Sequence, residues 1–236
     1  MCWSRIMASS SAEGGQGPTR AAPRRGGSQR SVGGKAPFNK PIIIGVTGGM
    51  ASGKSTLARM IAGRGIAHLD ADKIVHHLLQ HDRQVQTEIA AAIPAAKNAA
   101  NGIDRAKLAA HISAHPEALR TLETILHPRV RGVEERAILL ARANRLRALI
   151  LDIPLLFETD AQHLCDVVIV AHAPLPHRRK RAFARPGMTE EKFRRLLDRQ
   201  LPDHHRNRAA DVVISTAIGK AATRRKIQAL MREWGL

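Results

Sequence analysis

A glycine-rich segment carries the strongest chemical signal of the chain. Residues 48–55 read Gly-Gly-Met-Ala-Ser-Gly-Lys-Ser and fit the pattern G-x-x-x-x-G-K-[ST] at every position. Glycines let the backbone turn tightly, so that its N–H groups converge on an anion at the N-terminus of a helix. Lys54 would reach the β- and γ-phosphates of ATP, and the Ser55 hydroxyl would ligate Mg²⁺. The pattern therefore predicts a phosphate-binding loop (P-loop), whose other contacts we expect from Gly49, Met50, Ala51, Ser52, Gly53 and Thr56.

The surroundings of this loop favour a nucleotide site over a chance match in a glycine-containing turn. Ile42 to Val46 is an apolar run typical of a strand buried on both faces of a parallel sheet. A helix is expected from about Ser55 to Ala62. Strand, loop and helix in this order form the context in which the motif holds a nucleotide.

Three acids follow predicted strands, at the edge where ligands gather in open parallel sheets. Asp70 and Asp72 close a short strand at 66–69, and either could accept a proton from an attacking hydroxyl. The alternative is that such an acid caps the next helix. One of the two can be the cap while the other accepts the proton. Asp152 ends the strand 148–152 and has the form of a Walker-B ligand for Mg²⁺.

Arginines crowd a helical segment after the fourth predicted strand. Arginine forks bind phosphate bidentately and can neutralise the charge that develops during phosphoryl transfer. The alternative is a solvated basic face, but so many neighbouring arginines would repel one another without an anion nearby. We therefore favour a phosphate lid formed by Arg178, Arg179, Arg181 and Arg185.

Strands alternate with helices along the chain, which predicts an α/β fold with a parallel sheet and right-handed crossovers. The region between the second and third strands shows helical patterns alone and is expected to form an insertion. Strands are expected at 42–46, 66–69, 148–152, 167–171 and 212–214, and helices at 105–113, 117–126, 128–143 and across 175–200.

Composition excludes several classes of protein. The hydrophobic share of 44% and charged share of 25% are typical of a folded globular chain, and no run approaches the roughly 18 apolar residues that a membrane helix needs. The two cysteines, Cys2 and Cys165, form no disulfide framework, so we expect a reducing compartment, the cytoplasm. Residues 1–39 are rich in Gly, Ser and Arg and are expected to be a disordered basic tail.

The formal net charge of +18 makes nucleic acid a conceivable partner. Aromatic residues, however, make up only 3% of the chain, and no stacking platform or RNA-binding signature is present. We therefore expect a small-molecule substrate, no specific nucleic acid and no membrane, in a monomer or small homo-oligomer. A P-loop protein that binds nucleic acid remains the alternative to one that acts on a small molecule.

Taken together, the motifs resemble those of the dephospho-CoA kinase family, across about residues 41–233. The more specific elements are L-E-x-I-x-H-P at residues 122–128 and P-L-L-F-E at residues 154–158. They occur in this order with the P-loop, Asp70-Ala71-Asp72, Asp104-Arg105, Cys165-Asp166, the arginine-rich segment, Gln200 and Ala210-Asp211. A nucleoside or nucleotide kinase, which shares the P-loop and lid arginines, is the alternative within the same class.

The resemblance implies a P-loop NTPase fold with a five-stranded parallel core. The kinase domain would span 40–236, with a coenzyme-binding helical insertion at about 73–147 and a lid at about 174–200. It implies ATP-dependent phosphorylation of the ribose 3′-hydroxyl of dephospho-CoA. Asp72 would be the base, Lys54 and Ser55 would hold ATP and Mg²⁺, and Arg181 and Arg185 would fold over the transferring phosphate. Asp70, Arg105 and His127 would lie on the acceptor side.

Two departures from the family pattern lie close to the nucleotide. Ala51 stands where the family usually has Gly, and the loop tolerates alanine if its φ is negative. Thr216 stands where the family generally has Asn, which affects a contact expected near the adenine.

Overall fold

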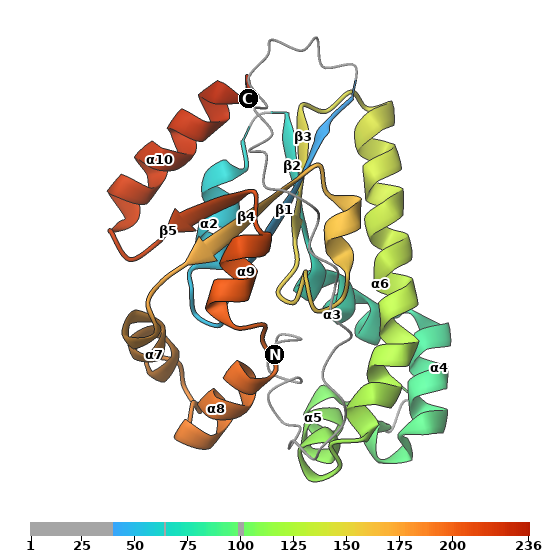
Figure 1. Ribbon diagram of the computed structural model, residues 1–236. Helices are drawn as coiled ribbons and strands as arrows, with labels where there is room; N and C mark the ends of the chain where they lie inside the picture. Colours follow the sequence, from blue (N-terminus) through green and yellow to red (C-terminus); the bar gives the residue numbers. More distant parts are fainter. Residues whose placement is uncertain (1–39, 64, 99–101) are drawn as a thin grey trace. The chain divides into compact units, whose positions relative to one another are not determined.

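The strand that precedes the P-loop, β1 (Ile42–Gly48), is the middle strand of a five-stranded sheet with the order β2-β3-β1-β4-β5 (Figure 1). In this computed structural model, which describes residues 40–63, 65–98 and 102–236, β1 pairs in parallel with both neighbours, and Ile44 lies opposite Ile150 and Val167. The predicted α/β class is confirmed. The predicted tail at 1–39 lies outside the described residues. The other strands are β2 (Ile66–Asp70), β3 (Ala148–Asp152), β4 (Val167–His172) and β5 (Val212–Ser215).

β1 is buried on both faces, as its sequence predicted. Ile44 and Val46 are 0% exposed on one face, and Ile43 is 2% exposed on the other. A Cβ at Gly45 would lie 2.6 Å from the Cys165 sulfur, so this strand position admits glycine alone.

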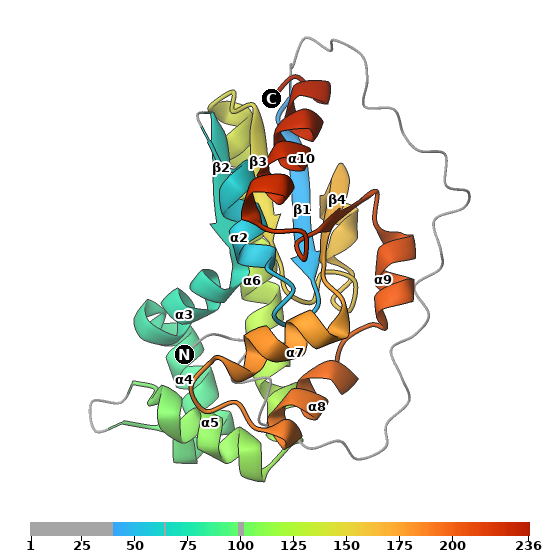
Figure 2. The same ribbon diagram turned by 90° about the vertical axis from the view of Figure 1, so that its left-hand side faces the viewer.

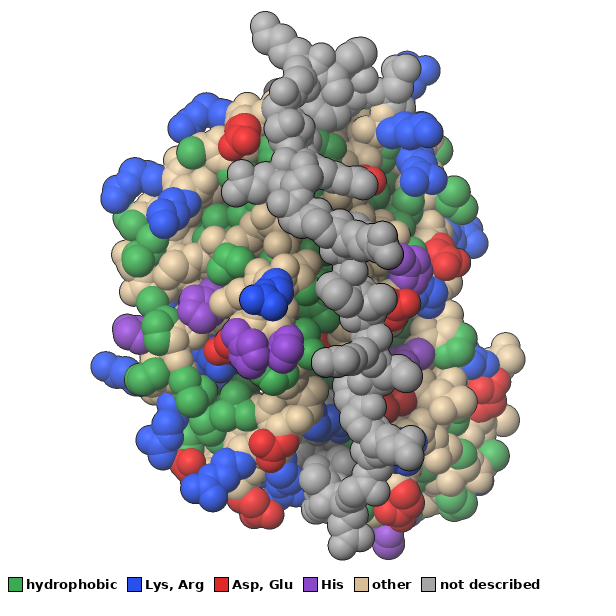
Figure 3. Space-filling model, viewed as in Figure 1, with side chains coloured by type: hydrophobic (Ala, Val, Ile, Leu, Met, Phe, Trp, Pro, Cys, Tyr) green, Lys and Arg blue, Asp and Glu red, His purple; other side chains and the backbone are tan. Residues whose placement is uncertain are grey.

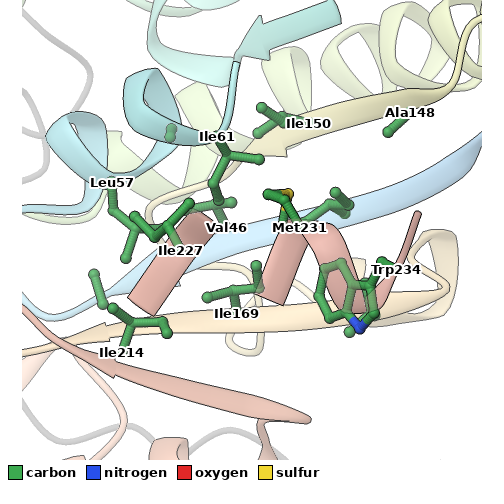
Figure 4. Close-up of a cluster of buried hydrophobic side chains, with 14 residues drawn as sticks. Val46, Leu57, Ile61, Ala148, Ile150, Ile169, Ile214, Ile227, Met231 and Trp234 are labelled. Atoms are coloured by element: carbon green, nitrogen blue, oxygen red, sulfur yellow. The ribbon is translucent and has the colours of Figure 1, made fainter. Parts of the chain in front are cut away.

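One face of the sheet is covered by α2 (Lys54–Ile61) and α10 (Lys220–Glu233), which lie side by side (Figure 2). Leu57 and Ile61 of α2, and Ile227 and Met231 of α10, belong to one core cluster with side chains of β1 and its neighbours (Figure 4). The residues of this cluster on β1 and its two neighbours are Ile44, Val46, Ala148, Ile150, Val167, Ile169 and Ala171. Trp234 closes this core beyond the end of α10. Burial of these side chains, each stabilising by about 1.5–3 kcal/mol, fixes the start of α2 directly after the P-loop.

The chain divides into two compact units. The described part of the first unit comprises Asp70–Glu135 and Thr189–Arg199, and that of the second comprises 40–69, Arg136–Met188 and Gln200–Leu236. The first unit is built from helices around buried leucines and isoleucines. These helices are α3 (Ala71–His81), α4 (Arg83–Ala92), η2 (Pro94–Ala96), α5 (Arg105–Ala114), the larger part of α6 (Ala118–Ala143) and α8 (Glu190–Asp198). The second unit also holds η3 (Ala161–Leu164), α7 (Leu175–Phe183) and α9 (Asp203–Ala209).

α6 differs from the prediction because it runs unbroken through Pro128, where the sequence predicted two helices. A proline inside a helix costs about 3 kcal/mol. Leu119, Leu122 and Leu126, all buried, anchor the turns before it, and Arg129 donates to the Ile125 carbonyl at 2.8 Å. Packing of the apolar face therefore outweighs the local propensity of the proline.

The arginine-rich stretch, predicted as one helical region, forms two helices. α7 ends at Phe183, Gly187 adopts a φ of 74°, and Thr189 caps α8 by accepting from the Lys192 N–H. These turn and cap features end the first helix and start the second. The sequence analysis did not predict α9 and α10, both of which are rich in charged side chains.

The distribution of basic side chains on the surface is relevant to nucleic acid as a partner. In Figure 3, lysine and arginine side chains are interspersed with acidic and apolar ones on the visible face, outside the part that grey atoms cover. Among the described residues, every helix is too short or too polar to cross a bilayer.

Candidate active site

The P-loop ends in a helix N-terminus that is open to an anion. Gly53 occupies the N-cap of α2 with a φ of 95°, a left-handed conformation that favours glycine, and no side chain of the described residues caps this helix. The first-turn N–H groups of a helix lack intrahelical acceptors. Those of Lys54 and Ser55, with the positive end of the helix dipole, can therefore receive phosphate oxygens.

The two leading glycines of the loop are required by packing. A Cβ at Gly48 would lie 2.6 Å from the Ser52 hydroxyl. A Cβ at Gly49 would overlap with Nη1 of Arg178 and would lie 2.9 Å from Nη1 of Arg206. Side chains at either position would displace the loop or the arginines that lie against it.

Ala51 corrects one expectation. Its φ is +56°, in the left-handed region, whereas tolerance of alanine was expected to depend on a negative φ. A left-handed conformation costs a non-glycine residue about 1–2 kcal/mol, and the surrounding loop maintains it here.

Replacing Ala51 with glycine should therefore stabilise the fold. The relieved backbone strain exceeds the entropy that glycine adds to the unfolded chain, leaving a gain of about 0.5–1 kcal/mol in the free energy of unfolding. Urea denaturation measures this value. The control is Ala58→Gly, inside α2, which should lower stability by about 1 kcal/mol from helix propensity and further by the loss of a fully buried methyl group. Equal destabilisation by both substitutions would show that the Ala51 backbone carries no strain.

At the carboxyl end of β3, Asp152 is fully buried and forms an ion pair with Nζ of Lys54. Nε2 of His68 lies 3.3 Å from the other carboxylate oxygen. The structure thus brings two predicted site residues together and adds a third that the sequence reasoning missed. The signal for His68 is its place two residues before the end of β2, next to β3 in the sheet.

Arg181 of α7 is bound to the P-loop through its guanidinium. Nη1 donates to the Ser52 carbonyl at 3.3 Å and to the Thr216 hydroxyl at 3.0 Å, and Nη2 donates to the Thr216 carbonyl at 2.8 Å. The Thr216 hydroxyl itself donates to the Ser52 carbonyl. Thr216 therefore holds the loop and Arg181 together. Arg185, beyond the end of α7, is exposed.

The P-L-L-F-E motif supports the loop through the segment around Gln200. Leu156 is fully buried, and the Glu158 carboxylate accepts from the Leu201 N–H at 2.8 Å. The neighbouring Gln200 side chain accepts from the Met50 N–H at 2.9 Å. Glu158 and Gln200, both identified in the sequence analysis, thus belong to one series of contacts that ends at the P-loop.

Asp70 and Asp72 belong to the first unit and differ in their surroundings. The Asp70 carboxylate caps α3, accepting from the Asp72 N–H at 3.0 Å and the Lys73 N–H at 3.4 Å. Asp72 lies half-buried in the first turn of α3. The structure therefore gives Asp70 the capping position that the sequence had left open between the two acids.

Arg105 and His127 also lie in the first unit. Arg105 is the first residue of α5, behind Asp104, which caps the helix by accepting from the Ala106 and Lys107 N–H groups. His127 lies on α6, where Glu123 of the same L-E-x-I-x-H-P motif pairs with Arg199 at 2.9 Å. Desolvation lowers the pKa of His127 below its ordinary 6.5; Glu123 opposes this shift and Arg131 adds to it.

His127 should accordingly be neutral at pH 7, and its imidazole signals in an NMR titration should have a midpoint below 6.5. With a lowered histidine pKa, stability falls on acidification from the unfolded-state pKa down through the lower folded-state pKa, because the unfolded chain binds the proton first. His127→Gln should remove these signals and flatten the fall in stability on acidification. A midpoint above 6.5 would contradict this assignment.

A family model described as dephospho-CoA kinase matches residues 42–220. A dephospho-CoA kinase of Mesorhizobium japonicum is 39% identical over 193 residues, covering 81% of this chain and 96% of that protein. The crystal structure of TT1252 from Thermus thermophilus covers 82% of this chain and 98% of its own, with a TM-score of 0.66 and 30% identity. The structure of a dephospho-CoA kinase from Campylobacter jejuni gives a TM-score of 0.62 at 25% identity, covering 81% and 96%.

Proposed function

Because the chain belongs to the dephospho-CoA kinase family, we propose that it transfers the γ-phosphoryl group of ATP to the ribose 3′-hydroxyl of dephospho-CoA, giving coenzyme A. The observation that carries the proposal is the P-loop, in which an uncapped helix N-terminus stands beside the buried pair of Lys54 and Asp152. We place this activity in the cytoplasm.

The residues around the P-loop fit a nucleotide with Mg²⁺. Asp152 offers a fully buried carboxylate that pairs with Lys54, and Ser55 offers a hydroxyl in the first turn of α2. Oxygen ligands of this kind suit Mg²⁺. Bound there, the ion would neutralise charge on the phosphate oxygens.

The protein's own contribution is to position and to neutralise. The N–H groups at the start of α2 hold phosphate oxygens in place, and Lys54 bridges the β- and γ-phosphates. Arg181 approaches the loop from α7, where its guanidinium already donates to the loop, and Arg185 lies exposed beyond the end of that helix. Removing water from this region strengthens each of these interactions.

We assign the proton acceptor to Asp72. A carboxylate near the attacking hydroxyl orients it and takes its proton as the phosphoryl group moves. Asp70 caps α3, whereas Asp72 lies half-buried in the first turn of that helix, and we assign the base to Asp72. On the acceptor side, Arg105 offers a cation for the diphosphate of dephospho-CoA, and neutral His127 offers a hydrogen bond.

A panel of acceptors tests this function. ADP release by the purified full-length chain is measured with ATP and either dephospho-CoA, adenosine, AMP or no acceptor, with and without EDTA. Rapid release with dephospho-CoA alone, abolished by EDTA, is expected. Release that requires adenosine or AMP instead would make the protein a nucleoside or nucleotide kinase.

A further inference from the structure

A pair of buried arginines lies against the first turn of the P-loop, separate from Arg181. Arg178 of α7 and Arg206 of α9 are each 4% exposed. Both lie within contact distance of the position that a Cβ of Gly49 would take. Their guanidinium groups therefore form part of the wall of the loop.

One carboxylate holds both arginines. Nη2 of Arg178 donates to one oxygen of Asp203 at 2.9 Å, and Nη1 of Arg206 donates to the other oxygen at 2.9 Å. Arg206 also donates to the Leu201 carbonyl. Asp203 and Arg206 are three residues apart on α9, so a single helical turn presents both to Arg178.

The charges of this cluster do not balance. Two guanidinium groups share one carboxylate, which leaves one positive charge in a buried place. Nε of Arg178 is buried and has no hydrogen-bond partner among the described residues. Burial lowers the pKa of Arg178, with Asp203 opposing the shift and Arg206 adding to it. A buried donor without an acceptor and a buried charge without a counterion both lower the stability of the fold. A bound anion would supply the acceptor and the opposite charge.

We propose that Arg178, held by Asp203 and backed by Arg206, is a fixed phosphate-binding residue that donates to the polyphosphate of the nucleotide in the P-loop. The inference rests on the proposed function, because that function brings the anion to the loop. It differs from a lid in that the guanidinium is already in place before the nucleotide binds. The anion supplies the missing negative charge and an acceptor for the free N–H groups.

Arg178→Gln tests the proposal through the binding of ATP, ADP and adenosine, measured by calorimetry without acceptor. We expect ATP and ADP to bind about 10- to 100-fold more weakly, in the range for a charge-assisted hydrogen bond, and adenosine to bind as before. Lys180→Gln, an exposed site on the same helix, is the control for loss of charge and should leave all three affinities unchanged. Unchanged ATP affinity in Arg178→Gln, or an equal loss for adenosine, would overturn the proposal.

Asp203→Asn is a second test, and it does not depend on how well Arg178→Gln folds. Arg178→Gln is expected to weaken anion binding, whereas Asp203→Asn is expected to increase the stabilisation that an anion provides. Removal of the carboxylate leaves two uncompensated guanidinium groups, so the nucleotide-free protein should melt at a lower temperature. Pyrophosphate should then raise its melting temperature more than it raises that of the wild type. Equal pyrophosphate shifts would mean that the cluster only joins α7 to α9. Wild-type protein that fails to bind ATP would refute the proposed function itself, whereas ATP binding that is insensitive to Arg178 would refute this inference alone.

Discussion

Replacing Lys54 with alanine should lower turnover about 10²- to 10³-fold and should weaken ATP binding as well, because one charged donor to the phosphates is lost. Lys54 forms an ion pair with Oδ1 of Asp152. The substitution therefore also leaves a fully buried carboxylate with His68 as its remaining partner. A lower melting temperature should accompany the loss of activity.

ATP affinity and the rate of CoA formation are measured on the same preparation. Lys226→Ala removes an exposed lysine of α10 and serves as the control, with activity and stability expected to match the wild type. Lys54→Arg tests whether the positive charge alone is sufficient, because it keeps the charge and replaces the ammonium with a planar guanidinium group. Full activity in folded Lys54→Ala would contradict a nucleotide site at this loop.

Replacing Asp72 with asparagine should lower turnover about 10²- to 10⁴-fold, the usual contribution of a general base, while ATP binding stays within about twofold. Asparagine keeps the shape of the side chain and removes the proton acceptor. The comparison with Asp70→Ala is informative because Asp70 caps α3 and alanine cannot accept from the first-turn N–H groups. That variant should lose about 1 kcal/mol of stability with little change in turnover.

The two variants are compared by steady-state kinetics and by urea denaturation. A drop in kcat for Asp72→Asn and a drop in stability for Asp70→Ala would separate the base from the cap. Unchanged turnover in folded Asp72→Asn would transfer the role to Asp70 or Asp152, or would show that the reaction needs no base.

Features set by short segments were predictable from the sequence. The strand at 42–46, the glycine-rich loop and the following helix are encoded within about twenty residues, so their order and the positions of Lys54 and Ser55 could be read directly. The acid at the end of β3 was predictable for the same reason. The structure extends each predicted strand by two residues or fewer.

Features that depend on distant packing were not predictable in this way. His68 meets Asp152 because β2 lies next to β3, a strand order that periodicity does not specify. Gly49 meets Arg178 because α7 follows β4, the other neighbour of β1. The positive φ of Ala51 is set by the loop around it and not by its side chain. In each case the decisive contact joins segments that lie far apart in the sequence or reflects strain that tertiary structure maintains.

The position of the transferred phosphate tests the central claim most directly. The purified chain is incubated with dephospho-CoA, ATP and Mg²⁺, and the product is examined by phosphorus NMR and mass spectrometry, with Lys54→Ala as the parallel sample. The account predicts a new phosphomonoester on the 3′-oxygen of the ribose, absent from the Lys54→Ala sample. Consumption of ATP without this product, or a phosphate on another oxygen, would contradict it.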